Sequence, residues 1–149
     1  MNVLIAIDFS EHTQQFLDDT VKLLRNVLEE VWLLHVAEPE PDFIGFEIDP
    51  AVMRDQVAEG FHQERRQLQA MADALRERGV AATALQIQGE TVKTIVQQAG
   101  KLNADLIVVG AHGHGAWHRF LVGEVDQAEL QAAGRPLLVM PVLKNPRPA

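Results

Sequence analysis

Four glycines, Gly110, Gly113, Gly115 and Gly123, mark the segment 110–123, which lies between a predicted buried strand and a predicted helix. Gly110 ends the strand, Gly113 follows after two residues, and Gly123 directly precedes the helix. Glycine lets a ligand approach the main chain closely, and a helix N-terminus offers unpaired N–H groups and a positive dipole end. The spacing therefore predicts a phosphate-binding loop. It is not the dinucleotide pattern, because His118 takes the place of the third glycine, and no Walker lysine follows.

Histidines crowd the same loop. His112, His114 and His118 stand near Glu124 and Asp126, and imidazole with carboxylate suits Zn²⁺ or Mn²⁺. Their spacing matches no standard metal site, however, and solvated side chains explain it equally well. We assign no metal to this loop. His35, inside a predicted strand, is expected to be a core or edge residue without a chemical role.

The sequence offers no recognisable catalytic apparatus. It contains no cysteine, which excludes a disulfide framework, a thiolate zinc site and a cysteine nucleophile. No Ser-His-Asp arrangement is apparent, and the carboxylates have no partnered nucleophile. We predict no catalytic residue, and slow ATP hydrolysis is left open.

Composition limits the class of protein further. The 149 residues, of which 47% are hydrophobic, are enough for one domain with a sizeable core. The net charge of −8 and the scattered basic residues argue against nucleic-acid binding. Neither a membrane span nor a signal peptide fits the apolar runs, so we expect a cytoplasmic protein that binds no membrane.

Strand and helix patterns alternate along the whole chain. Short apolar runs predict strands at 3–7, 31–36, 80–87, 105–110 and 136–142. Helical spacing of apolar residues predicts helices at 11–28, 51–78, 89–102 and 124–133. Ser10 is the expected N-cap of the first helix, and Gly79 is expected to end the second. The expected domain spans 1–143, followed by a flexible tail at 144–149.

This alternation predicts an α/β fold, a doubly wound open parallel sheet of five strands with helices on both faces. Ligands of such folds bind beyond the carboxyl ends of the strands, where the strand order reverses. If the first and fourth strands flank that point, Asp8, Val36 and Gly110 lie together.

Specific motifs resemble the universal stress protein family. Three motifs are similar to the C-terminal half of that family. They are DLIVVGAHGHG from Asp105, FLVGEVD, which contains Gly123, and PLLVM from Pro136. VLIAIDFSE at the start is similar to its first strand and turn, and LLHV before residue 37 to its second strand. The resemblance covers essentially the whole chain. It implies the strand order 3-2-1-4-5.

For family members that bind ATP, the resemblance implies particular roles. The aspartate after the first strand lies by the adenosine, and the main chain at the end of the second strand recognises adenine. Later residues line the ribose and phosphates and cap the phosphate chain. The candidate nucleotide-binding residues are therefore Asp8, Val36, Val109, Gly110, Gly113, His114, Gly123, Glu124, Val125 and Asp126.

The sequence departs from the family at the phosphate end. Glu124 and Asp126 stand where the ATP-binding motif places Ser or Thr. An ionised carboxylate only accepts hydrogen bonds, and at 4 Å and an effective dielectric near 20 each carboxylate–phosphate pair costs roughly 4 kcal/mol. The loop histidines with Arg119, or a bridging Mg²⁺, offer compensating positive charge. AMP, adenosine or a metal-bridged nucleotide is therefore favoured over bare ATP.

Two hypotheses for function follow. The first is a universal-stress-type regulatory or protective protein with an adenine-nucleotide site altered at its phosphate end. The second is an interaction module that binds no nucleotide and acts through a protein partner. The apolar last strand would form a sheet edge, and the resemblance implies a homodimer built there.

Overall fold

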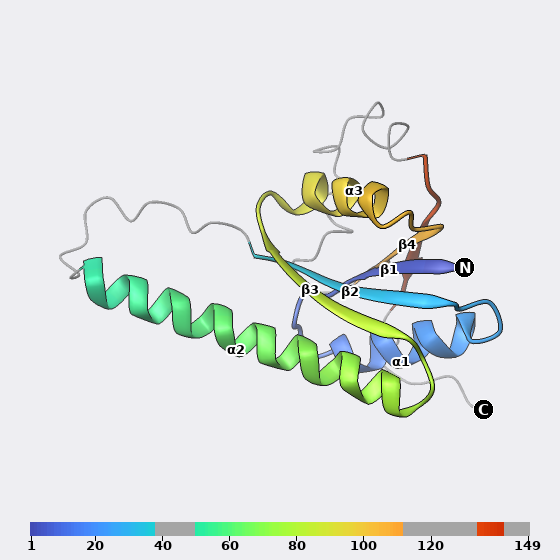
Figure 1. The fold of residues 1–149 in the computed structure, drawn as a ribbon, viewed down its shortest axis with the longest axis horizontal. Coiled ribbons are helices and arrows are strands. Elements are labelled where there is room, and N and C mark those ends of the chain that lie inside the picture. The colour runs from blue at the N-terminus through green and yellow to red at the C-terminus, as the bar shows by residue number, and fades with distance from the viewer. Residues whose placement is uncertain (38–49, 112–133, 142–149) are drawn as a thin grey trace.

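The computed structural model describes residues 1–37, 50–111 and 134–141, with the main chain alone for 50–57. Its strands are β1 (Asn2–Ala6), β2 (Glu30–Ala37), β3 (Ala82–Gln88), β4 (Leu106–Gly110) and β5 (Leu137–Met140). Its helices are α1 (Thr13–Leu24), α2 (Pro50–Glu77) and α3 (Thr91–Lys101) (Figure 1). Within these ranges, no helix is both long and apolar enough to cross a membrane.

The five strands form one parallel sheet in the order β3-β2-β1-β4-β5, which confirms the predicted topology. The chain winds outward from β1 to β2 and β3, then returns to the other side of β1 for β4 and β5. The strand order therefore reverses between β1 and β4. In doubly wound folds, this reversal is where a ligand site opens at the carboxyl ends of the strands.

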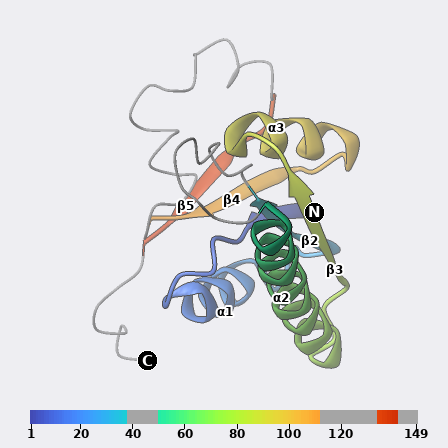
Figure 2. The same cartoon turned by 90° about the vertical axis from the view of Figure 1, so that its left-hand side faces the viewer.

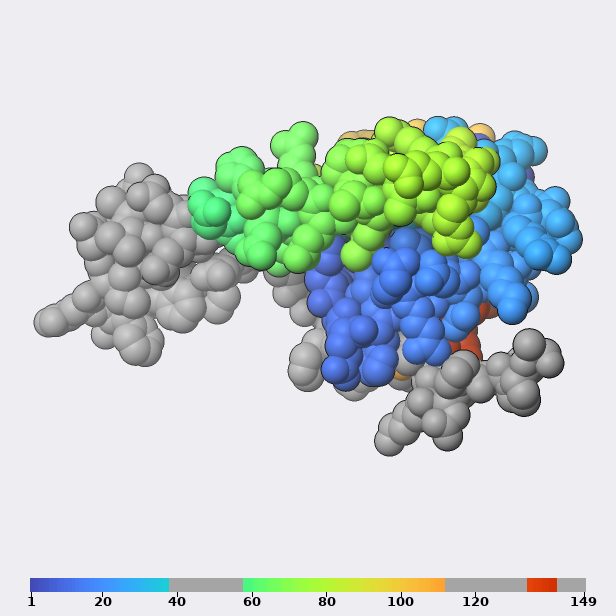
Figure 3. All heavy atoms as spheres, turned by 90° about the horizontal axis from the view of Figure 1, so that it is seen from below, coloured from blue at the N-terminus to red at the C-terminus, as the bar shows by residue number. Residues whose placement is uncertain are grey.

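Helices cover both faces of the sheet, as expected. α1 and α2 lie on one face and α3 on the other (Figure 2). From below, α1 and α2 lie side by side and form one surface (Figure 3). The α1/α2-side core includes Val3, Ile5, Phe16, Leu17, Leu33, Leu68 and Leu75, and the α3-side core includes Leu4, Leu34, Ile95, Ile107 and Val109. Successive side chains of β1 thus pack in opposite cores, because side chains alternate along a strand.

Gly79 ends α2 as the sequence predicts. It has φ of +84°, a conformation that residues with a Cβ rarely adopt. Its N–H donates to the carbonyl of Arg76, and the N–H of Val80 donates to that of Leu75, both at 3.0 Å. These two bonds are the Schellman pattern. The helix has 28 residues, about 42 Å at 1.5 Å per residue, and extends well past the strands it covers (Figure 1).

The predicted N-cap of the first helix is wrong. α1 begins at Thr13 with His12 in the N-cap position, and no side chain caps it. Asp8 instead organises this turn by accepting hydrogen bonds from the Ser10 N–H (3.1 Å) and the Thr13 hydroxyl (3.3 Å). Because Ser10 is held in that turn, the helix starts three residues after it.

The first helix also ends earlier than predicted. It stops at Leu24, whose carbonyl accepts from the N–H groups of both Val27 (2.9 Å) and Leu28 (3.1 Å). Val27 is 47% exposed, so it does not continue the apolar face. Helical spacing alone did not reveal the stop because Leu28 still packs against the core from the turn.

The other described elements agree with the prediction to within two residues at each end. The predicted helix at 124–133, the tail at 144–149 and the domain boundary at 143 lie outside the described residues.

Core packing on α2 gives a stability prediction. Leu75 is 2% exposed, whereas Leu23 on α1 is 62% exposed. Leu75→Ala should lower the free energy of unfolding by about 2–5 kcal/mol, because it removes buried contacts and leaves a cavity. Leu23→Ala is the control and should change it by less than about 0.5 kcal/mol in urea denaturation. Equal losses for the two variants would contradict this packing.

Candidate functional site

The predicted site residues follow the carboxyl ends of the three central strands. The last registered pairs around β1 are Ile5 with Val108 and Ala6 with Leu34. Continuing this register brings Ile7 level with Gly110, and Asp8 level with Val36. The structure therefore brings Asp8, Val36 and Gly110 to the switch point, as the predicted strand order requires.

Asp8 begins the loop that leaves the sheet after β1. Its Oδ1 accepts from the Ser10 N–H at 3.1 Å and from the Thr13 hydroxyl at 3.3 Å. Thr13 is the first residue of α1, so the carboxylate also lies near the positive end of that helix dipole. Between them, Phe9 has φ of +55°, which is unfavourable for a residue with a Cβ. Asp8 is thus held in one orientation at the strand end.

The end of β2 presents main-chain groups toward β1. The Leu34 carbonyl accepts from the Ile7 N–H at 2.8 Å, so the main-chain groups of Leu34 face β1. Because main-chain groups two residues apart in a strand point to the same side, the N–H and C=O of Val36 also point toward β1. Among the described residues, no main-chain hydrogen bond joins Val36 to Ile7. The Val36 peptide thus faces the space where β1 turns away.

The end of β4 supplies main chain rather than side chains. Val109 is 1% exposed and packs in the α3-side core, so its side chain is not available to a ligand. Gly110 pairs with Met140 of β5, and the Ala111 N–H donates to the Met140 carbonyl at 2.8 Å. Any contribution of Val109 and Gly110 to a site is therefore through the peptide backbone.

The phosphate end of the predicted site lies outside the described residues. This applies to Gly113, His114, Gly123, Glu124, Val125 and Asp126, and to the metal hypothesis for the histidine loop. Among the described residues, no group of three or more His, Cys, Asp or Glu side chains is arranged to hold a metal ion.

Sequence analysis missed a polar cluster beside the site. The His35 ring lies between the Ile7 carbonyl, 2.8 Å from Nδ1, and Glu64 of α2, 3.0 Å from Nε2. Glu64 also accepts from Gln86 of β3 at 3.4 Å. The only signal in the sequence was a histidine within an apolar strand. Its partner is 29 residues away on another element, which no local pattern reveals.

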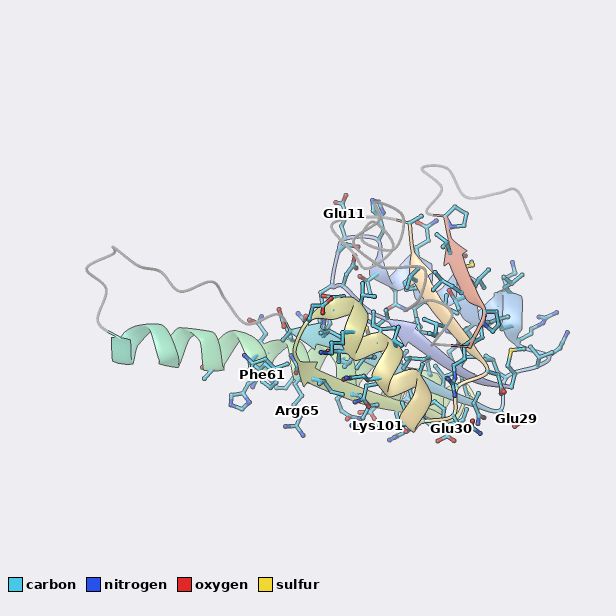
Figure 4. The ribbon with its side chains drawn as sticks, turned by 90° about the horizontal axis from the view of Figure 1, so that it is seen from above. Glu11, Glu29, Glu30, Phe61, Arg65 and Lys101 are labelled. Carbon is cyan, nitrogen blue, oxygen red and sulfur yellow. The ribbon has the colours of Figure 1, made fainter. Side chains whose placement is uncertain are left out.

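The carboxyl ends and the amino ends of the strands are well separated. Glu11, which follows β1, lies far from Glu29 and Glu30, which precede and begin β2 (Figure 4). Phe61 and Arg65 belong to the part of α2 near Glu64 (Figure 4). Asp8 follows β1 and His35 lies near the end of β2, so both belong to the carboxyl ends of the strands.

This fold and edge geometry define a doubly wound α/β protein with a candidate ligand site at its switch point. A family model described as the universal stress protein family matches residues 1–141. The chain belongs to the universal stress protein family. It is 26% identical over 143 residues to universal stress protein YxiE of Bacillus subtilis, covering 93% of this chain and 97% of that protein.

Solved structures support the same fold. A universal stress family protein from Burkholderia pseudomallei superposes with a TM-score of 0.66 at 23% identity, covering 95% of this chain and 96% of that one. A family protein from Arabidopsis thaliana with AMP bound gives a TM-score of 0.61 at 19% identity, covering 100% of this chain and 96% of that one.

The Asp8 turn gives a second stability prediction. Asp8→Ala removes the acceptor for two hydrogen bonds and should cost about 1 kcal/mol of unfolding free energy. Asp8→Asn keeps a carbonyl oxygen that can accept both bonds, so its loss should be less than half as large. Urea denaturation of both variants measures this. If Asp8→Asn were as unstable as Asp8→Ala, the role of these two bonds would be contradicted.

Proposed function

We propose that this chain is a cytoplasmic regulatory or protective protein that binds an adenine nucleotide at the carboxyl edge of its sheet. The observation that carries the proposal is the register around β1, which brings Asp8, Val36 and Gly110 to one switch point. In this arrangement the Asp8 carboxylate accepts hydrogen bonds from ribose hydroxyls, and the main chain of Val36 pairs with the edge of the base.

The family relationship supports the same ligand class. The Arabidopsis relative was solved with AMP bound. In our proposal the adenosine part binds at Asp8 and Val36, which the described fold brings together. The phosphate part extends toward the loop at 110–123.

Charge at the phosphate end favours AMP over bare ATP. Glu124 and Asp126 take positions at which the family's ATP-binding motif has hydroxyl residues. Their negative charges oppose a polyphosphate, whereas AMP carries one phosphate with fewer charges to oppose. Mg²⁺ bridging a carboxylate to phosphate oxygens would offset this repulsion.

Isothermal titration calorimetry with AMP and ATP tests this proposal. AMP should bind more tightly than metal-free ATP, and Mg²⁺ should strengthen ATP binding. Asp8→Ala should lower the affinity for AMP at least about tenfold, since it removes a charged hydrogen-bond acceptor for the ribose hydroxyls. The double variant Glu124→Ser with Asp126→Thr should improve metal-free ATP affinity at least about tenfold, because it replaces two repulsive charges with donors.

A matched control and a contrary outcome complete the test. Asp73 on α2 is exposed and pairs with Arg76, so Asp73→Ala should leave AMP affinity unchanged. The absence of binding heat for AMP and for ATP, with and without Mg²⁺, would refute the nucleotide site. It would favour the second hypothesis, an interaction module acting through a protein partner.

We further propose that the chain forms a homodimer through β5. This strand is apolar, half-buried and at the edge of the sheet, and among the described strands only β4 pairs with it. Light scattering at micromolar concentration should give twice the chain mass of 16.5 kDa. A monomeric wild-type protein would exclude this dimer.

A further inference from the structure

His35 of β2 connects the end of β1 to helix α2. Its Nδ1 is 2.8 Å from the Ile7 carbonyl oxygen, and its Nε2 is 3.0 Å from Glu64 Oε2. The His35 side chain is only 13% exposed, against 42% for Glu64. Gln86, the register partner of His35 on β3, adds a hydrogen bond from its amide to the same Glu64 oxygen at 3.4 Å. The imidazole therefore joins the residue after β1 to helix α2, and Glu64 joins that pair to β3.

Both ring nitrogens of His35 face oxygen atoms. The Ile7 carbonyl oxygen can only accept, so the contact at 2.8 Å requires a hydrogen on Nδ1, which donates it. Nε2 lies 3.0 Å from the Glu64 carboxyl group on the opposite side of the ring. The ring is therefore held between two oxygen atoms that come from different elements.

The bond from Nδ1 lies where the β1–β2 ladder stops. Continuing the ladder past Leu34 would direct the Val36 N–H to the Ile7 carbonyl. Among the described residues that main-chain bond is not formed, and the Ile7 carbonyl accepts from the His35 ring instead. The imidazole therefore pairs with the carbonyl of Ile7, the residue after β1, and among the described residues the Val36 N–H has no main-chain partner on this side.

The same ring supports the turn that carries Asp8. The Phe9 ring meets the His35 ring edge to face, with centroids 4.6 Å apart and planes at 64°. Phe9 is the residue at φ of +55°, so this contact favours a main-chain conformation that is otherwise unfavourable. Asp8 lies between Ile7 and Phe9, and His35 contacts both of these neighbours.

We propose that His35, held by Glu64, is a positioning residue that keeps the Asp8 carboxylate and the Val36 peptide in ligand-binding geometry. This inference rests on the proposed nucleotide site. His35 fixes the residues on both sides of Asp8 and replaces the main-chain bond that would otherwise occupy Val36. Glu64 orients the ring from α2, so displacing α2 changes the site without contacting the ligand.

Substitutions at the two positions separate this role from general stability. His35→Phe keeps a ring beside Phe9 but removes both hydrogen bonds. It should lower the affinity for AMP about tenfold in calorimetry. Glu64→Ala removes the partner of Nε2 and should lower the affinity for AMP about fivefold. Glu64→Gln can still pair with Nε2 and should restore affinity to within about twofold of wild type.

Amide resonances in ¹H–¹⁵N spectra report the positioning directly, without any ligand. His35→Phe and Glu64→Ala should shift the signals of Asp8, Phe9 and Val36, and Glu64→Gln should shift them less. Leu75→Ala is the destabilised control, because it lies 11 residues further along α2 and about 16 Å away at 1.5 Å per residue. It should leave these three signals in place.

The two readouts keep failure of the inference distinct from failure of the proposed function. If wild type binds AMP but His35→Phe changes neither affinity nor the three signals more than Leu75→Ala does, the positioning role is wrong. If wild type binds no nucleotide, the proposed function fails, and the amide signals still decide whether His35 holds the Asp8 turn. Shifts of equal size in all variants would also overturn the inference.

Discussion

The burial of β1 on both faces is the constraint on which the rest of the structure depends. Val3, Leu4 and Ile5 are completely buried, with alternate side chains in the two cores. A strand in this position must have β2 and β4 on its two sides to satisfy its main chain. The chain must therefore wind outward once in each direction. The strand order reverses beside β1, and its carboxyl end opens at that reversal.

The candidate site follows from how the strand ends satisfy their polar groups. Each peptide group that leaves the sheet needs a new partner, and side chains provide several here. The Asp8 carboxylate accepts from the Ser10 N–H, and the His35 ring donates to the Ile7 carbonyl. The same contacts that end the strand in a defined way also hold a carboxylate and an open peptide beside each other. The contacts that end β1 and those that shape the proposed binding site are thus the same contacts.

Fold and ligand are set by different residues in this family. The sheet depends on buried apolar side chains, whereas in our proposal ligand binding depends on a few polar groups at the strand ends and in the segment 110–123. In our proposal, carboxylates at Glu124 and Asp126 in place of hydroxyl groups change the charge at the phosphate end of the site. One scaffold can therefore carry nucleotide sites of different charge preference.

The sequence by itself determined the existence and order of the described strands and helices, and the residues at the ends of the central strands. Apolar runs and Gly79 act over a few neighbouring residues, so they are visible in the sequence. The strand order also needed the family resemblance, and the structure confirms it. Only the tertiary structure decided that Ser10 does not cap α1 and that His35 joins Ile7 to Glu64. The two His35 contacts depend on how a crossover returns one element over another, and separations of 28 and 29 residues leave no periodic trace. The Ser10 turn is local, but its conformation depends on the Asp8 carboxylate, which competes for the Ser10 N–H and the Thr13 hydroxyl.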